Sequence, residues 1–257
     1  MSLYTDLEAS FLGASRALIV QAAINPLKVL ENRQCSSSLT THHLAVTIFM
    51  QGGGKAFFSD LPYQMLKASI KGIWQWPMIM QLPKVFKGYQ FTEIQSQALV
   101  GIAIASADAG FLTPLERGIA RSASVGKRVP LQKLFHEGWK GIGMQWVRNS
   151  VLWVAFLTSQ EFFRARAYDK TKTPLTLIQA TVVGLKASIF VSAVGAPFIF
   201  ANILQYTQNR PPLSPLTKQE CVNLFRTSRI TLTALALQNV GSAIIYNALK
   251  NDQNDDR

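Results

Sequence analysis

The sequence is poor in the residue types on which most enzymes and metal sites depend. Among 257 residues there are 2 cysteines and 3 histidines, and neither Cys35 nor Cys221 has a second cysteine or histidine at a metal-binding spacing. We find no HExxH motif, no glycine-rich phosphate loop and no pairing of a nucleophile with a base. We therefore expect no enzymatic activity, no metal and no cofactor, and we expect both thiols to be unpaired.

Acidic residues are also scarce, because 14 Asp and Glu stand against 26 Lys and Arg, for a net charge of +12. A nucleic-acid-binding protein would gather its basic residues in one patch, whereas here they are spread between apolar segments. We therefore expect no nucleic-acid partner. An anionic lipid surface, or an interior that concentrates anions, agrees better with this distribution.

The two ends of the chain carry few structural signals. The first ten residues, MSLYTDLEAS, have no basic region and no cleavage site, so we expect neither a signal peptide nor an arginine-rich presequence there. The last seven residues, 251–257, read NDQNDDR, and this polar composition predicts a disordered tail.

Long apolar segments dominate the rest of the chain. There are six of them, at residues 9–33, 58–82, 95–122, 142–167, 175–208 and 221–250. Each exceeds the ~20 helical residues that cross a bilayer, and none shows the sustained alternation of a strand. The linkers hold the helix breakers and many charges, and the stretch CSSSLTTHH at 35–43 is predicted to be a loop. The sequence predicts an all-α membrane protein with six transmembrane helices.

Charged residues interrupt several of these segments. They are Arg16, Lys67, Lys71, Arg148, Lys186 and Arg229. A charge that faces lipid at mid-membrane costs about 3 kcal/mol or more, so these side chains should line a water-filled interior. The alternative is a soluble, basic helical protein.

An internal repeat favours the membrane protein. The first, third and fifth segments each contain a proline preceded, thirteen residues earlier, by a glycine, and the prolines are spaced by 88 and 83 residues. The pairs are Gly13 and Pro26, Gly101 and Pro114, and Gly184 and Pro197. A second small residue follows each glycine by four positions, a spacing that lets helices pack closely in lipid. Three such marks in register predict three two-helix repeats, 1–90, 91–172 and 173–250.

Further motifs make the chain resemble the mitochondrial carrier family. FHEGWKG is similar to the aromatic-basic-glycine motif that begins the even helices of that family, and Glu161 with Arg164 is similar to the motif that ends them. The resemblance covers almost the whole chain. It implies six transmembrane helices around a central cavity, and exchange of small anions across the mitochondrial inner membrane by alternating access. It also implies a monomer in a lipid bilayer with cardiolipin among its lipids.

The chain departs from the family at the gates. The family places an acid and a base after each proline, and these residues pair to close the matrix side. Here Lys28 and Glu31 occupy the two positions in reverse, Glu116 has no base, and the third repeat has no charge. We expect a weak gate, or one rebuilt from contacts such as Lys28 with Glu116. At the opposite gate Glu161 and Arg164 form a complete motif, Lys250 lacks an acid, and Met80 replaces one.

The resemblance also implies where substrates bind. Its three contact sites fall on Lys67, on Arg148 with Asn149, and on Ala234 with Leu235, and Lys71 lies one turn from Lys67. An arginine followed by a small polar residue is similar to carriers of carboxylates and keto acids. Nucleotides such as ATP and ADP stay open, because lysine and arginine also bind phosphate.

Less specific roles for these residues stay open as well. Lys67 and Lys71 can extend toward lipid headgroups, and Arg148 can pair with Glu161 or with a backbone carbonyl in a structural role. The main alternative for the whole protein is a membrane adaptor or scaffold that keeps the carrier fold and does not transport.

Overall fold

The computed structural model of the chain describes the backbone of residues 3–125, 130, 139–171, 176–208, 211 and 214–255. Within these ranges the structure describes all side chains except those of residues 3–14, 16, 17, 76, 80, 87, 124, 125, 169–171, 239 and 241–255.

The described residues form helices and turns, with no strand among them. Six helices are long: α1 (Leu3–Gln34), α3 (Leu61–Gly88), α4 (Glu93–Val125), α6 (Ile142–Thr171), α7 (Leu177–Gln208) and α8 (Lys218–Asp255). They correspond to the six predicted segments, which confirms the all-helical prediction. Helix α8 continues to Asp255, five residues into the predicted tail.

Two short helices lie in the first linker, α2 (Thr41–Gly52) and the 3-10 helix η1 (Gly53–Phe58). The prediction of a loop for 35–43 was wrong from Thr41 onward, because the hydroxyl of Thr40 accepts a hydrogen bond from the backbone N–H of His43 and begins α2. Leu44 and Ile48 then bury one face of α2 against Val29 of α1. Capping and burial together outweigh the polar composition of this stretch.

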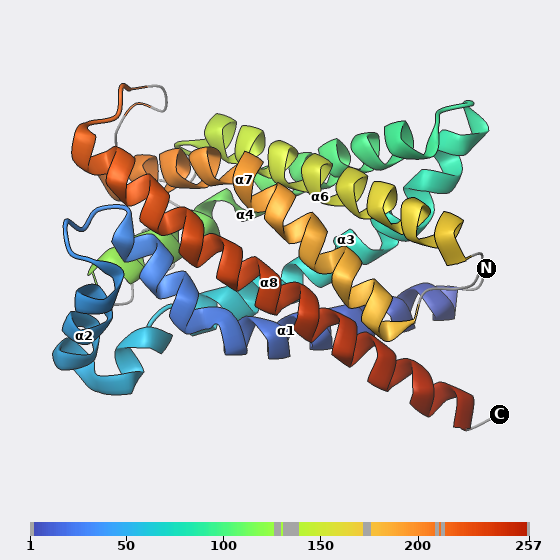
Figure 1. The fold of residues 1–257 in the computed structure, drawn as a ribbon, viewed down its shortest axis with the longest axis horizontal. Helices are drawn as coiled ribbons and strands as arrows, with labels where there is room; N and C mark the ends of the chain where they lie inside the picture. Colours follow the sequence, from blue (N-terminus) through green and yellow to red (C-terminus); the bar gives the residue numbers. More distant parts are fainter. Residues whose placement is uncertain are drawn as a thin grey trace.

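The six long helices form a closed ring in sequence order. Each long helix contacts the next along the chain, and α8 returns to contact α1 (Figure 1). The two ends of the chain lie at one end of this bundle, and α2 lies at the other. We call these the terminal end and the α2 end. An even number of long helices places both chain ends on one side.

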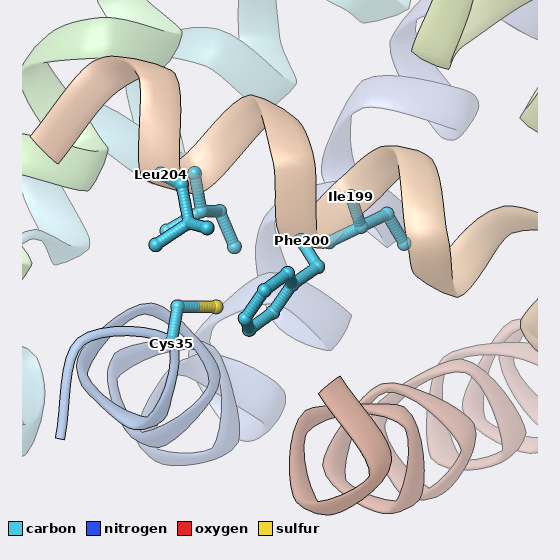
Figure 2. Close-up of a cluster of buried hydrophobic side chains, with 5 residues drawn as sticks. Cys35, Ile199, Phe200 and Leu204 are labelled. Atoms are coloured by element: carbon cyan, nitrogen blue, oxygen red, sulfur yellow. The ribbon is translucent and has the colours of Figure 1, made fainter. Parts of the chain in front are cut away.

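Toward the α2 end, apolar packing joins the first, third and fifth long helices, α1, α4 and α7, to their neighbours, and we call these three the odd helices. Cys35, just after α1, packs against Phe200, Ile203 and Leu204 of α7 (Figure 2). A second cluster joins Tyr63 of α3 to α4. These contacts hold the C-terminal ends of α1, α4 and α7 close to the helices that begin beside them.

The environment of Cys35 predicts a large difference in thiol reactivity. Cys35 is 1% exposed whereas Cys221 is exposed, and burial raises the pKa of the Cys35 thiol. At neutral pH a water-soluble maleimide should label one cysteine, Cys221, in the folded protein and both after unfolding. Mass spectrometry of the labelled protein measures this, with Cys221→Ser as the control. Rapid labelling of Cys35 in the folded C221S protein would contradict the packing.

The small residues of the repeat lie at helix contacts where the structure describes them. A Cβ atom at Gly101 would lie 2.8 Å from the backbone nitrogen of Val154 in α6. In α7, Gly184 is buried, and the hydroxyl of Ser188 donates to the carbonyl oxygen of Leu235 in α8 at 3.5 Å. The surroundings of Gly13 are outside the described side chains. Pro26, Pro114 and Pro197 lie inside α1, α4 and α7.

Two of the described helices are long and apolar enough to cross a membrane by length and composition. They are α4, over Glu93–Ala123, and α7, over Leu177–Gln208. The other long helices include those that carry Lys67, Lys71 and Arg148, and such charges lower their hydropathy. The coarse architecture is therefore six long helices with two candidate spans.

Candidate anion-binding site

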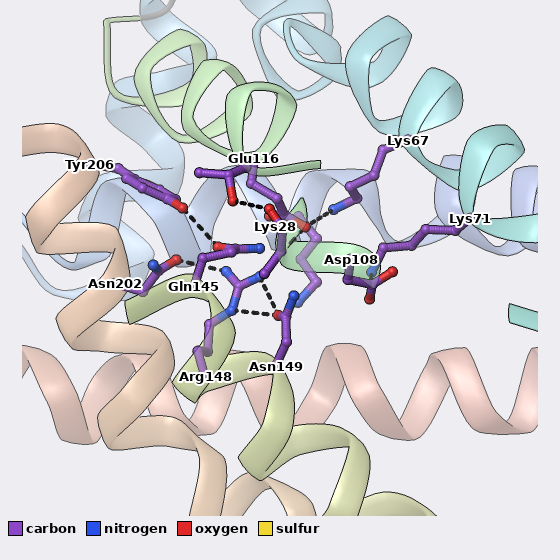
Figure 3. Close-up of polar contacts among 12 residues, drawn as sticks. Lys28, Lys67, Lys71, Asp108, Glu116, Gln145, Arg148, Asn149, Asn202 and Tyr206 are labelled. Carbon is purple, nitrogen blue, oxygen red and sulfur yellow. Dashed lines mark hydrogen bonds and ion pairs between the residues drawn. The ribbon is translucent and has the colours of Figure 1, made fainter. Parts of the chain in front are cut away.

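A buried carboxylate, Glu116 of α4, is the centre of the polar interior. One of its oxygens, Oε1, lies 3.2 Å from Lys67 Nζ of α3 and 3.5 Å from Arg148 Nη2 of α6 (Figure 3). The three side chains are 11–16% exposed. Three helices thus meet at one carboxylate shared by two cations.

Two asparagines fix the plane of the Arg148 guanidinium. Asn149 Oδ1 accepts from Nε at 3.1 Å and from Nη2 at 2.8 Å, and Asn202 Oδ1 of α7 accepts from Nη1 at 2.8 Å. Because arginine can only donate, these contacts orient both amides with their oxygens toward Arg148. The guanidinium is therefore held in one orientation between α6 and α7.

Several buried amide nitrogens around Arg148 have no hydrogen-bond partner among the described residues. They belong to Gln145, Asn149 and Asn202. Gln145 is oriented through its oxygen, which accepts from the hydroxyl of Tyr206 at 2.9 Å. Unsatisfied buried donors carry a free-energy cost of about 1–3 kcal/mol each, so their concentration at one place indicates a site for an acceptor-rich ligand or for water.

A second carboxylate, Asp108, lies two turns before Glu116 in α4. It is 0% exposed, and its Oδ2 lies 2.9 Å from Lys71 Nζ. The side chains of Trp74, Gln75 and Trp153 also donate to it, at 3.1–3.3 Å. Asp108 therefore ties α3 and α6 to α4 and neutralises Lys71.

A third contact closes the ring between α8 and α1. Glu31 accepts from Lys28 Nζ at 2.8 Å and also accepts from the hydroxyl of Thr231. Lys28 is thus paired within its own helix. The expected contact of Lys28 with Glu116 does not form. Lys28 pairs with Glu31, and Glu116 pairs with Lys67 and Arg148.

The structure brings together three of the predicted binding residues, Lys67, Arg148 and Asn149. Lys71 lies one turn away on Asp108. Ala234 is 0% exposed in α8, so its methyl group is closed to a ligand in this conformation. The lysines are directed at carboxylates rather than at headgroups.

The alternative pairing of Arg148 with Glu161 is wrong. Glu161 instead pairs with Arg164 at 3.0 Å in the last third of α6, where Arg164 is 62% exposed. This pair lies within one helix and joins no two helices. The side chains of Lys250 and Met80, its partners in the predicted gate, lie outside the described residues.

At the α2 end, two arginines join the helices that acid–base pairs after the three prolines were expected to join. Arg33 Nε donates to the carbonyl oxygen of Ala123 at 2.7 Å, which joins α1 to α4. Arg121 Nε donates to the carbonyl oxygen of Tyr206 at 3.3 Å, which joins α4 to α7. The Cys35 cluster completes the triangle between α7 and α1. The odd helices are therefore joined at this end by carbonyl contacts and apolar packing.

Four residues of this interior were not predicted: Asp108, Gln145, Asn202 and Tyr206. Asp108 had a usable signal, since it is an acid inside the apolar segment 95–122. Asn202 stands where the family places a base, and it accepts a hydrogen bond from a base on another helix. Nothing in the local sequence of Gln145 or Tyr206 indicates their contact, because it depends on how α6 and α7 cross.

Among the described residues, no group of three or more His, Cys, Asp or Glu side chains is placed to hold a metal ion. Comparison of the sequence with models of protein families finds no match, and comparison with curated proteins also finds none.

Proposed function

We propose that this protein transports small anionic metabolites across the mitochondrial inner membrane by alternating access, as an antiporter. The ligands are carboxylates and keto acids, or nucleotides such as ATP and ADP. The observation that carries the proposal is the closed ring of six long helices around a cation pair, Lys67 and Arg148, that shares a single carboxylate.

The distribution of apolar side chains supports a position in a bilayer. Each of the six long helices has at least one large apolar side chain that is about half exposed or more. These include Ile19, Ile73, Phe111, Phe162, Ile189 and Phe225. Exposed apolar side chains on every long helix agree with a ring that contacts lipid on its outside, since extended exposed apolar patches mark membrane or protein contacts. The placement of both chain ends at one end of the bundle agrees with an even number of spans.

The contacts of Glu116 support a transport step driven by ligand binding. An incoming carboxylate binds beside Glu116 and shares Lys67 and Arg148 with it, so it weakens the contacts that hold α3 and α6 to α4. Binding therefore loosens helix contacts at the centre of the ring. A ligand shifts the two-state equilibrium only through such differential contacts. Opening would follow at the α2 end, where carbonyl contacts and packing join the odd helices.

Uptake into proteoliposomes tests the proposal. Vesicles loaded with dicarboxylates, keto acids, phosphate, ADP or ATP should show saturable uptake of at least one of them by the parent protein. Lys67→Ala and Arg148→Ala should each reduce that uptake by at least about tenfold, since each removes a charge-assisted contact worth roughly 1.5–3 kcal/mol. Lys84→Ala, an exposed lysine near the end of α3, is the control and should retain uptake.

A second candidate function is a non-transporting membrane adaptor of the same architecture. It is favoured by one observation: Lys28, Lys67, Lys71 and Arg148 each have a carboxylate partner within the chain itself. Ion pairs of this kind join the helices whether or not the protein transports. Folded parent protein that takes up none of the anions would favour the adaptor, and loss of the protein from membranes on carbonate extraction would contradict both functions.

A further inference from the structure

The ion pairs of the interior do not balance at the central carboxylate. Lys28 is matched by Glu31, and Lys71 is matched by Asp108. Lys67 and Arg148, by contrast, share Glu116, so this trio has two positive charges against one negative. One positive charge therefore remains within the trio itself, and Asp60, the further buried carboxylate whose charge acts on Lys67, is already held by the amides of Asn25 and Gln64. Buried charges are stable when paired, so the trio favours a partner with one negative charge.

The hydrogen-bonding capacity around Arg148 agrees with such a partner. Of the five N–H groups of the guanidinium, the described contacts use one on Nε, two on Nη2 and one on Nη1. One N–H on Nη1 remains. Lys67 uses one of its three donors on Glu116. Two further donors, the amide nitrogens of Asn149 and Asn202, are buried and without partners among the described residues.

These unsatisfied groups are donors, and they lie beside the uncompensated charge. Asn149 is 4% exposed and Asn202 is 0% exposed, so bulk water does not satisfy them. A carboxylate has two oxygens and about four acceptor sites, and it carries one charge. A single carboxylate therefore satisfies both the charge and the donors, whereas a doubly charged group would reverse the charge of the trio.

We propose, on the basis of the transport function above, that this site binds one singly charged carboxylate and that Glu116 sets the charge of the preferred ligand. Glu116 acts as an internal counter-ion, which removes one unit from the two positive charges of Lys67 and Arg148. Asn149 and Asn202 position Arg148 through their oxygens and donate to the ligand through their nitrogens. The ligand class is thus narrowed to monocarboxylates, keto acids with one carboxylate included, ahead of dicarboxylates and nucleotides.

A matched pair of anions tests this proposal. Butyrate and succinate have the same number of carbons and carry one and two charges at neutral pH. Titration of each against the thermal midpoint of the detergent-purified full chain gives two apparent dissociation constants and their ratio. The parent should bind butyrate more tightly. Glu116→Gln should move the ratio toward succinate by at least about tenfold, because it removes the negative charge beside Lys67 and Arg148 and so raises the net charge of the site by one unit.

Glu220→Gln is the control for this measurement. It removes one carboxylate at the start of α8, where Glu220 accepts from the backbone N–H of Thr217 and glutamine can do the same. The ratio should stay at the parent value. A second variant leaves Glu116 in place. Asn202→Asp places a carboxylate of the chain against the Arg148 guanidinium, so butyrate should no longer raise the thermal midpoint.

Two outcomes would overturn the charge assignment and leave transport standing: tighter binding of succinate by the parent, or an unchanged ratio in E116Q. If E116Q does not fold, persistence of butyrate binding in N202D overturns it as well. Folded parent protein that binds neither anion, and that takes up none of the anions in vesicles, would remove the proposed function together with this inference.

Discussion

Asp108→Ala should be among the most destabilising single substitutions in this protein. It would leave the partly exposed charge of Lys71 without its partner at 2.9 Å, and it would also remove the buried acceptor of Trp74, Gln75 and Trp153. Breaking a buried ion pair from one side costs about 3–5 kcal/mol. We expect a loss of this size in the free energy of unfolding, measured by detergent titration or as a fall in the thermal midpoint.

Two companion variants make this expectation specific. Glu161→Ala removes a carboxylate whose partner, Arg164, is 62% exposed, and it should change stability by no more than about 1 kcal/mol. Combining Asp108→Ala with Lys71→Met removes the unpaired charge and should recover a large part of the loss. Equal losses in the free energy of unfolding for Asp108→Ala and Glu161→Ala would show that the contacts of Asp108 do not stabilise the packing of α3, α4 and α6.

Gly101→Val should produce a loss of similar size for a different reason. At this position even a Cβ atom would lie 2.8 Å from the backbone nitrogen of Val154 and 3.0 Å from the carbonyl carbon of Trp153. Backbone cannot rotate away as a side chain can, so α4 and α6 would have to separate. Overpacking of this kind costs about 1–3 kcal/mol for one added carbon group and more for a branched side chain.

Gly110→Ala in the same helix is the matched control. No heavy atom lies within 4 Å of a Cβ built at Gly110, so the substitution should be neutral or stabilising by up to about 1 kcal/mol, since alanine favours the helix. The thermal midpoints of Gly101→Ala and Gly101→Val should therefore lie below that of the parent. The midpoint of Gly110→Ala should equal or exceed it. A Gly101→Val protein as stable as the parent would contradict the close contact of α4 with α6.

The sequence was sufficient for the secondary structure because periodic apolar segments and breakers act locally. The predicted segment 175–208 and the observed α7, Leu177–Gln208, differ by two residues at one end. The miss at Thr41 has a local cause as well: the cap by Thr40 and the burial of Leu44 and Ile48 outweigh a polar run. Local signals fail where two of them compete.

The candidate site was predictable to the extent that a charge in an apolar helix needs a partner. That argument indicated Lys67, Lys71 and Arg148 without showing which carboxylate each would meet. Partner choice depends on helix crossing and rotation. Glu116, expected at a gate, lies between Lys67 and Arg148, and Asp108 lies on Lys71.

The sequence by itself determined six long helices, the close contact at Gly101 and three of the basic residues inside the bundle, Lys67, Lys71 and Arg148. Helix periodicity, small side chains and the cost of charge in an apolar setting are properties of short stretches of chain. The tertiary structure alone decided that α8 closes the ring on α1, that two cations share Glu116, and that Asn202 orients Arg148. These contacts join residues as far apart as Glu31 and Thr231, 200 positions along the chain, and their energies depend on distances that no local pattern specifies.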